Sequence, residues 1–465
     1  MTNSRLWSQL FSGLVIALSV SLPAHATNLW DVYEAAKGDD PVLGAARAGF
    51  AATEQTVPQA RSALLPSLGV SANTSWTERE FPGALAPNPV TGLLEPVPDQ
   101  NFNDHGWNAQ LRQPLLDMSA WHSLSSAKAN VRAAGHNLAA TEQELIVRVV
   151  QAYLNVLRAQ DRLDTTMAEE AAVKRQLEQV QQRFDVGLVA ITDVLESQAA
   201  YDSAVVRRIQ ADGDHDIFFE TLATLSGQSY DELDRLSERL PIVDPNPKNE
   251  QEWVETALSQ NLGIKNALEQ LAAARKNVRA RRSGHLPTID ATVTQVHSVT
   301  GSANFFNADT TDQTVYGLEL SLPLYSGGFT RARTREAKAQ ANQAQQLLLN
   351  QQRTVTRDTR NLYQAVATDV VRVRARLKAI ASSQSALDAT ETGYEVGTRN
   401  IVDVLQAQQR LFSSQFDYAD SRYNYVIDLM LLKQVAGALI EDDLRELNTF
   451  ADPNDTVKRI VSANN

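Results

Sequence analysis

The sequence predicts a mainly α-helical chain, duplicated in tandem, in which each half contains a helix, a β-hairpin and very long helices. Two observations support this fold class. The first is that proline is absent from residues 115–240 and 324–452. Proline breaks helix interiors at a cost of about 3 kcal/mol, so these stretches can form unusually long helices. The second observation is that the two halves match each other at a constant offset.

The composition excludes several classes of function. The chain has 465 residues, with 43 Lys and Arg against 55 Asp and Glu, giving a formal net charge of −12. Nucleic-acid binding requires clustered positive charge, so this balance argues against a nucleic-acid partner. Cysteine is absent, which excludes thiol catalysis, thiolate metal sites and disulfide bonds.

Residues 1–26 have the pattern of a secretory signal peptide. Arg5 supplies positive charge, residues 10–22 form an apolar run, and Ala24-His25-Ala26 provides a cleavage site of the A-x-A type. The apolar run is too short to span a bilayer of about 30 Å as a helix. We therefore expect residues 1–26 to be removed and the mature protein to be exported.

The first proline-free stretch predicts a helix from about 119 to 183, roughly 65 residues or about 100 Å long at 1.5 Å per residue. Apolar residues recur there every seven positions, with an interruption at Glu170. The second stretch has the same periodicity, which is typical of helices packed along their length. The two series are Val149, Val156, Leu163, Leu177 and Phe184, and Val404, Leu411, Tyr418, Tyr425 and Leu432.

Segments between the long helices alternate apolar and polar residues, which indicates strands with one apolar and one polar face. The apolar positions are Leu68, Val70, Ala72, Thr74 and Trp76; Trp107, Ala109 and Leu111; Ile289, Ala291 and Val293; and Tyr316, Leu318, Leu320 and Leu322. A loop rich in proline and glycine, 81–101, joins the first pair, and loop 301–312 joins the second. We predict β-hairpins at about 64–115 and about 287–323.

The duplication is clearest near the ends of the long helices. Residues 184–198 match residues 394–408 at seven of fifteen positions, and Gly187 aligns with Gly397. Each glycine suits the left-handed residue that ends a helix. The predicted repeats are 27–226, with long helices at about 119–226, and 250–436, with long helices at about 329–436.

Four amphipathic strands cannot close a transmembrane barrel within one chain, since the smallest bacterial barrels have eight strands. Open sheet edges are not tolerated in lipid. Two copies of the chain provide eight strands and three provide twelve. Side chains fill an eight-stranded barrel, whereas twelve strands leave a lumen, so we favour three copies.

Four further motifs are distinctive: residues 29–36 with Asp40-Pro41, the LPLYSGG segment at 322–328, and the turn motifs at 186–194 and 396–405. With these motifs, the chain resembles the TolC family of outer-membrane channels of Gram-negative bacteria over essentially its whole mature length. It implies a homotrimer with a 12-stranded β-barrel in outer-membrane lipid and a periplasmic α-helical barrel. It also implies an equatorial region formed by residues 227–249 and the C-terminal tail, 437–465.

The resemblance further implies a passive exit duct. Its cargo would be proteins of type I secretion, small toxic molecules or both, delivered by an inner-membrane ABC, RND or MFS transporter through a periplasmic adaptor, the membrane fusion protein. The transporter selects the cargo, so the channel sequence identifies neither the cargo nor the transporter. No cofactor is expected.

The resemblance also places a gate at the turn ends of the helices. It pairs Asp193 with Tyr394 and Thr192 with Arg399, and it places Asp403 in an inward ring of acids. Three copies of Asp403 near an axis would repel anions and favour cations. The family's typical second acid is replaced here by Gln406, which weakens the expectation of strong cation selectivity.

The same residues also have a purely structural interpretation. Asp193 and Asp403 suit N-caps of helices that begin after the turns, and Tyr394 suits ordinary packing between helices.

A cluster of Asp212, Asp214, His215 and Asp216 suggests a metal site. An EF-hand would need Gly and Glu where Ile217 and Ala223 stand, so we expect a solvated helix instead. No nucleophile elbow, P-loop or zinc-protease motif occurs, and no enzyme is predicted.

Three alternatives belong to other classes. A non-channel periplasmic helical scaffold would not need the alternating strands. A periplasmic adaptor would frame one helical hairpin between globular β halves, whereas this chain has two hairpin-and-helix halves in tandem. An exported hydrolase would need a nucleophile and a base in a recognisable pattern.

Overall fold

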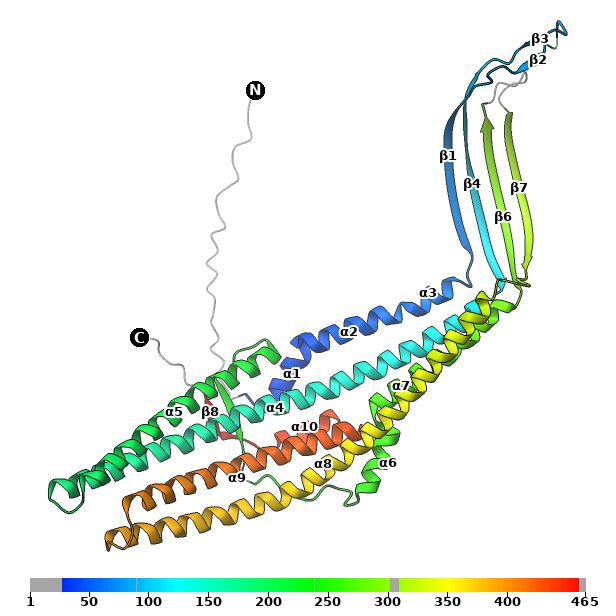
Figure 1. The fold of residues 1–465 in the computed structure, drawn as a ribbon. Helices are drawn as coiled ribbons and strands as arrows, with labels where there is room; N and C mark the ends of the chain where they lie inside the picture. Colours follow the sequence, from blue (N-terminus) through cyan, green and yellow to red (C-terminus); the bar gives the residue numbers. More distant parts are fainter. Residues whose placement is uncertain (1–26, 89, 238, 302–308, 460–465) are drawn as a thin grey trace, which may run out of the picture.

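The computed structural model describes residues 27–88, 90–237, 239–301 and 309–459. The chain is an elongated slab of long helices with a four-stranded sheet projecting from one end (Figure 1). The predicted signal peptide, 1–26, part of loop 301–312 and the last six residues of the predicted tail lie outside the described residues.

The N-terminal segment forms three short helices, α1 (Leu29–Asp39), α2 (Pro41–Glu54) and α3 (Thr56–Ser62). Asp40 separates the first two and caps α2, because its carboxylate accepts a hydrogen bond from the backbone N–H of Leu43 at 2.8 Å. Pro41 follows at the first helical position, where its missing N–H costs nothing. Arg148 lies 2.7 Å from the buried Asp40 carboxylate and thereby fixes this junction on the first long helix.

The four long strands are β1 (Ser67–Arg79), β4 (Gln100–Leu116), β6 (Thr288–Thr300) and β7 (Asp309–Ser321). They form one antiparallel sheet in the order β1-β4-β6-β7. Both predicted hairpins are therefore present, and strands β4 and β6 join the two repeats.

The loop predicted at 81–101 contains structure that the sequence analysis missed. Strand β4 begins at Gln100, and two short strands, β2 (Leu85–Pro87) and β3 (Leu94–Pro96), pair within the loop. Proline and glycine bound these strands, and that composition favoured a loop in the sequence analysis.

The alternation predicted for the strands gives the sheet two different faces. Leu68, Leu111, Val293 and Tyr316 form one row across all four strands. Polar side chains occupy the other face, where Arg112 lies 2.8 Å from Asp290 and Ser71 bonds Asn108. The described residues of the single chain leave the apolar face exposed.

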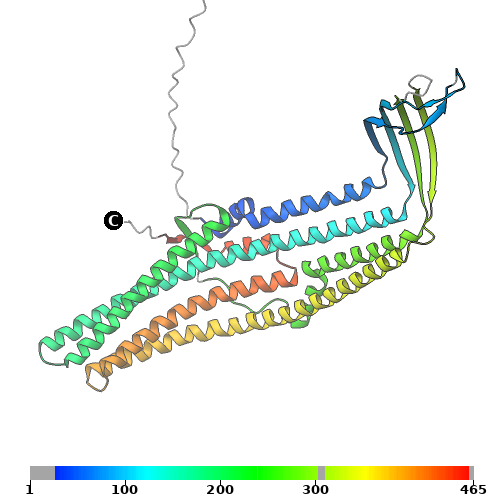
Figure 2. The ribbon, with the colours of Figure 1, turned by 45° about the horizontal axis from the view of Figure 1, so that its top comes forward.

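The long helices are α4 (Met118–Asp185) and α8 (Phe329–Glu395), with 68 and 67 residues. Each turns back into a helix of 36 residues, α5 (Ile191–Ser226) or α9 (Ile401–Ala436). The order across the slab is α5-α4-α9-α8 at the end far from the sheet (Figure 2). Near the sheet, α2 and α3 replace α5, and α7 (Leu262–Arg282) replaces α9. No helix within the described ranges is both long and apolar enough to cross a membrane.

A 3-10 turn, η1 (Ser283–His285), lies between the end of α7 and the start of β6. The remaining elements surround the middle of the slab, and they are β5 (Glu232–Leu236), α6 (Glu250–Gln260), α10 (Glu441–Asn448) and β8 (Ala451–Lys458). Strands β5 and β8 pair antiparallel.

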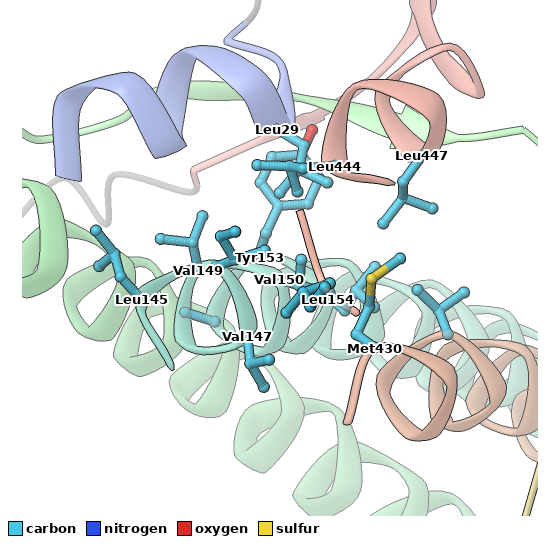
Figure 3. Close-up of a cluster of buried hydrophobic side chains, with 14 of the residues drawn as sticks. Leu29, Leu145, Val147, Val149, Val150, Tyr153, Leu154, Met430, Leu444 and Leu447 are labelled. Atoms are coloured by element: carbon cyan, nitrogen blue, oxygen red, sulfur yellow. The ribbon is translucent and has the colours of Figure 1, made fainter. Parts of the chain in front are cut away.

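The main hydrophobic core lies at this level and joins α1, α4, α9 and α10 (Figure 3). Leu29, Leu154, Met430 and Leu444 pack there, and the hydroxyl of buried Tyr153 donates to the backbone oxygen of Asp234. Both halves of the chain are thus joined in the middle of the slab.

Candidate gate at the helix tips

Two equivalent turns form the end of the molecule that is far from the sheet (Figure 1). Helix α4 ends at Asp185 and α8 at Glu395, and Gly187 and Gly397 follow with φ angles of +78° and +77°. Only glycine adopts this left-handed conformation without a steric cost. The glycines therefore end the helices as the sequence predicted.

The two turns differ in how they start the next helix. Asn400 is the N-cap of α9, and its side chain accepts from the backbone N–H of Asp403 at 2.8 Å, while the Asp403 carboxylate accepts from the N–H of Asn400. The N-cap of α5 is Ala190, without a side-chain cap. The alternative, purely structural interpretation of Asp193 and Asp403 as N-caps is therefore wrong. Each stands three residues later, and Asp403 is the reciprocal partner in a capping box.

A small apolar cluster joins the two helix pairs at the tips. It consists of Val180, Val194, Leu387, Ile401, Val404, Ala407 and Leu411. Tyr394 packs at its edge with Phe184 and Val189. This cluster is separate from the core in the middle of the slab.

Tyr394 lies near charges of opposite sign. The guanidinium of Arg183, on α4, lies 4.9 Å from the centre of the tyrosine ring, which is a cation–π contact between the helix pairs. Burial raises the pKa of Tyr394, and the Asp193 carboxylate raises it further while Arg183 opposes the shift. The buried Tyr394 hydroxyl has no hydrogen-bond partner in the described part of the chain, so its expected bond to Asp193 is not formed in the single chain.

The expected contact between Thr192 and Arg399 is also not formed. Arg399 lies 3.8 Å from the carboxylate of Asp403 on its own turn, and the Thr192 hydroxyl lies 3.4 Å from the carboxylate of its neighbour Asp193. Both of these contacts lie within one turn or one helix, whereas the pairs implied by resemblance connect the two tips. The fold thus brings all five residues to one end of the molecule without forming either bond.

A groove of about 420 Å³ runs between α4 and the α8–α9 pair above the tips. Arg175 and Arg183 of α4 line this groove, and so do Glu391 and Glu395 of α8. Gln408 also lines it, and its buried amide oxygen has no hydrogen-bond partner among the described residues. The sequence analysis missed Arg183. Its position one residue before Phe184, at the start of the duplicated segment, was the available signal.

The cluster at residues 212–216 is only partly solvated, which corrects the sequence-based expectation. His215 is fully buried against α4, edge-on to Phe219 with ring centres 5.0 Å apart. Burial lowers the pKa of His215, and Asp216 and Asp212 oppose that shift. Heptad spacing places His215 on the inner face of α5 and its acidic neighbours outside it.

Long paired helices that end in equivalent turns, together with an amphipathic sheet at the opposite end, define the architecture of a membrane channel subunit. The sequence profile of the outer membrane efflux protein family matches residues 32–228 and 253–438. The chain belongs to this family.

Individual relatives support the same family membership. The outer membrane protein TolC of Vibrio cholerae is 35% identical over 432 residues, covering 92% of this chain and 95% of the relative. The alkaline protease secretion protein AprF of Pseudomonas aeruginosa is 29% identical over 448 residues, covering 96% of this chain and 91% of AprF. The crystal structure of the Campylobacter jejuni CmeC outer membrane channel has a TM-score of 0.72 and 17% identity, covering 97% of this chain and 98% of that chain.

The predicted fold class and family are thereby confirmed. The protein is an efflux or secretion channel of the outer membrane that extends into the periplasm. The family is one of transport channels rather than of enzymes.

Proposed function

We propose that three copies of the chain close into a tube with a 12-stranded β-barrel at one end and an α-helical barrel at the other. The observation that carries the proposal concerns the four-stranded sheet: among the described residues, its edge strands β1 and β7 pair with no further strand, and its apolar face is left exposed. Trp76 on that face is 82% exposed in the single chain. Lipid would cover the apolar face, and pairing of β1 with β7 of the next copy would satisfy both edges.

The tube is proposed to be a passive exit duct without enzymatic activity. An inner-membrane ABC, RND or MFS transporter would deliver cargo through a periplasmic adaptor that docks near the helix tips. The relationship to AprF, named for alkaline protease secretion, supports protein cargo, and the efflux family supports small molecules. The segment at 227–249 and the tail from 437 would form the equatorial region, which is supported by the pairing of β5 with β8.

The helix tips are proposed to be the gate. Thr192, Asp193, Tyr394, Arg399 and Asp403 all lie there, and among the described residues the small apolar cluster and the Arg183–Tyr394 contact join the helix pairs at this end. Few contacts must break for the tips to separate, while the core in the middle of the slab holds the helices in place. A closed tip and an open tip would therefore differ by a modest free energy.

Light scattering in detergent and single-channel recording in planar bilayers test this proposal. We expect the mass of a trimer and a steady current that rises when the tips are loosened. A monomer that carries no current would contradict it. A deletion strain, tested for both drug sensitivity and loss of secreted protein, would then identify the kind of cargo.

A further inference from the structure

Positive charge gathers where the helical slab meets the sheet, although the chain as a whole has a net charge of −12. The last turns of α7 and the first turns of α8 supply it, and residues 270–287 contain no acid. The exposed cations are Arg275, Arg279, Arg281, Arg282, Arg331, Arg333, Arg335 and Lys338. Among the described residues, none of these cations is in an ion pair. Ion pairs within the described chain therefore do not account for this concentration of charge.

The cations of α8 lie on different sides of the helix. Gln352 lines a cavity between α8 and Leu258 of α6, and we call this side of the slab the α6 surface. Arg331 and Lys338 stand 21 and 14 residues before Gln352. Both spacings are whole numbers of heptads, so Arg331 and Lys338 share the α6 surface.

A second cavity, between α4, α7 and α8, marks the opposite surface. Leu347 of α8 lines it and stands about 140° around the helix from Gln352. Arg333 stands two heptads before Leu347 and shares its side. Gln270 of α7 lines the same cavity. At 100° per residue, Arg281 lies about 20° from Gln270, whereas Arg279 lies about 180° away, on the α6 surface.

The α6 surface is the outside of the proposed tube. Helix α6 packs onto α8 as an extra layer beside the long helices (Figure 1). On the inside of the tube this layer would obstruct the duct, so an open duct requires the α6 surface to face outward. We call Arg279, Arg331 and Lys338, the cations that this assignment places outside, the outer basic belt.

The outer basic belt stands at the depth of lipid head groups. Strand β7 has 13 residues, enough for the roughly 9–11 of a tilted transmembrane strand, so the hydrocarbon region ends near the junction of sheet and helices. At 1.5 Å per residue, Arg331 lies about 3 Å from the start of α8 and Arg279 about 5 Å from the end of α7. The polar region of a bilayer extends roughly 5–8 Å beyond the hydrocarbon. Lys338, about 14 Å from the start of α8, can approach this region with its long side chain.

Exposed aromatic side chains accompany the belt. Tyr325, in the turn between β7 and α8, is 88% exposed, and Trp121, near the start of α4, is 55% exposed. Tyrosine and tryptophan are enriched at membrane interfaces because their rings have both apolar and polar parts. The junction thus combines two features of a surface that lies in the head-group layer.

We propose that the outer basic belt binds the phosphate groups of anionic phospholipids in the periplasmic leaflet of the outer membrane. The inference rests on the proposed barrel, which places the junction at that leaflet. Two of the three cations are arginines, whose planar fork of donors matches phosphate oxygens. The exposed apolar face of the adjoining sheet favours a lipid over a soluble anion, because it holds the belt beside a bilayer. This contact would fix the depth of the tube in the membrane.

Native mass spectrometry of the full-length protein in detergent measures which lipids it retains. The protein is mixed with dioleoylphosphatidylglycerol or with zwitterionic dioleoylphosphatidylcholine at equal mole fraction. We expect Arg279→Gln with Arg331→Gln to lower retention of the anionic lipid on the order of tenfold and to leave retention of the zwitterionic lipid unchanged. The matched control is Arg281→Gln with Arg333→Gln, which removes the same charge at nearly the same level from the opposite surface and should change retention little. Arg331→Gln alone, with Arg333→Gln as its control, serves where a double variant does not assemble.

The outcomes separate this inference from the tube itself. Equal retention of both lipids by a wild-type trimer that carries current overturns the proposed contact and leaves the tube standing. An equal loss in both double variants also overturns it, because retention would then not depend on the outer surface. Displacement of the anionic lipid by inorganic phosphate would indicate a site for free anions and would likewise overturn it. A monomer that carries no current overturns the tube and this inference with it.

Discussion

The ring of Tyr394 lies between the helix pairs and contacts the guanidinium of Arg183. The negative charge of Asp193 is close enough to raise the pKa of the Tyr394 hydroxyl. This hydroxyl is buried and, within the described residues, unpaired. Leaving such a group without a partner costs about 1–3 kcal/mol. A closer approach of the two tips, which lets this hydroxyl donate to Asp193, would therefore be favourable. The cost of the unpaired hydroxyl is therefore a physical reason for a closed state in which Tyr394 and Asp193 are hydrogen-bonded.

At the residue scale, we expect Tyr394→Phe combined with Arg399→Ser to loosen the closed tips. The first change removes the hydroxyl and the second removes the guanidinium that would reach Thr192. Single-channel conductance in planar bilayers should rise above that of the wild type. Tyr363→Phe with Arg353→Ser, on the same helix but far from the tip, is the control. A conductance equal to that of the wild type would count against the gate.

At the scale of elements, the two repeats closely match in length. Helices α5 and α9 both have 36 residues, and each is followed by a glycine, Gly227 or Gly437, in the left-handed region. The turns at the tips have the same glycine but different caps, since Asn400 caps α9 and Ala190 cannot cap α5. The α8–α9 turn is therefore the better-ordered of the two tips by hydrogen bonding.

The glycine in that turn gives a second prediction. Gly397→Ala places a Cβ at a φ of +77°, which costs about 1–2 kcal/mol. Because the cost is local, hydrogen exchange of amides 393–399 should speed up while the middle of the slab is unchanged. Gly49→Ala in α2 is the control, as it has open space around it and ordinary helical backbone. If exchange in the turn is unaltered, the strain argument is wrong.

A buried carboxyl couples α8 to α9. Asp369 is almost completely buried, one of its oxygens has no hydrogen-bond partner among described residues, and Arg372 contacts the other. Burial, with the neighbouring Asp428, raises the pKa of Asp369 to about 6, although Arg372 opposes this shift. The folded chain therefore holds this proton more tightly than the unfolded chain, whose Asp titrates near 4.

The raised pKa of Asp369 makes the stability of the α8–α9 contact depend on pH. Between pH 4 and pH 6 the folded state binds more protons, so the stability of the α8–α9 contact falls as pH rises through this window. We expect hydrogen exchange around residue 369, corrected for intrinsic rates, to show greater protection at pH 5 than at pH 7. Asp369→Asn, which mimics the protonated acid, should remove most of this difference. Equal pH dependence in the variant would show that another group is responsible.

At the scale of the whole molecule, the described part of the chain is a slab with two edges at which no further element packs. The edges are β1 with α3, α2 and α5, and β7 with α8. Closure by three copies would bring three Asp403 side chains near one axis, although each also pairs with Arg399 of its own turn at 3.8 Å. The balance between these charges would then decide how strongly a pore formed by three copies favours cations.

Ion selectivity tests that balance. Asp403→Ala should reduce cation preference and block by multivalent cations, because three negative charges leave the narrow end. Asp403→Asn is the companion variant, since it removes the charge and keeps a side chain able to bond Asn400. Gln406→Glu should shift selectivity the other way. Unchanged reversal potentials in a salt gradient for all three variants would refute the acid ring.

The regular features were predictable from local patterns. The absence of proline and the seven-residue spacing of apolar side chains predicted a helix near 119–183. Helix α4 spans Met118–Asp185 because no proline in between breaks it. Alternation predicted both hairpins. Other local features were not predicted correctly. Asn400 rather than Asp403 is the N-cap of α9, because both residue types suit that position. The prolines at the ends of β2 and β3 favoured a loop where the structure has a small hairpin.

By itself the sequence determined the periodicities, the duplication and the turn glycines, since each depends on residues close together along the chain. Only the tertiary structure decided which residues meet across the two halves. The contact of Arg183 with Tyr394 and the burial of His215 depend on how rigid helices about 100 Å long are set side by side. Packing of the middle core sets that arrangement, and no local pattern at the tips encodes it.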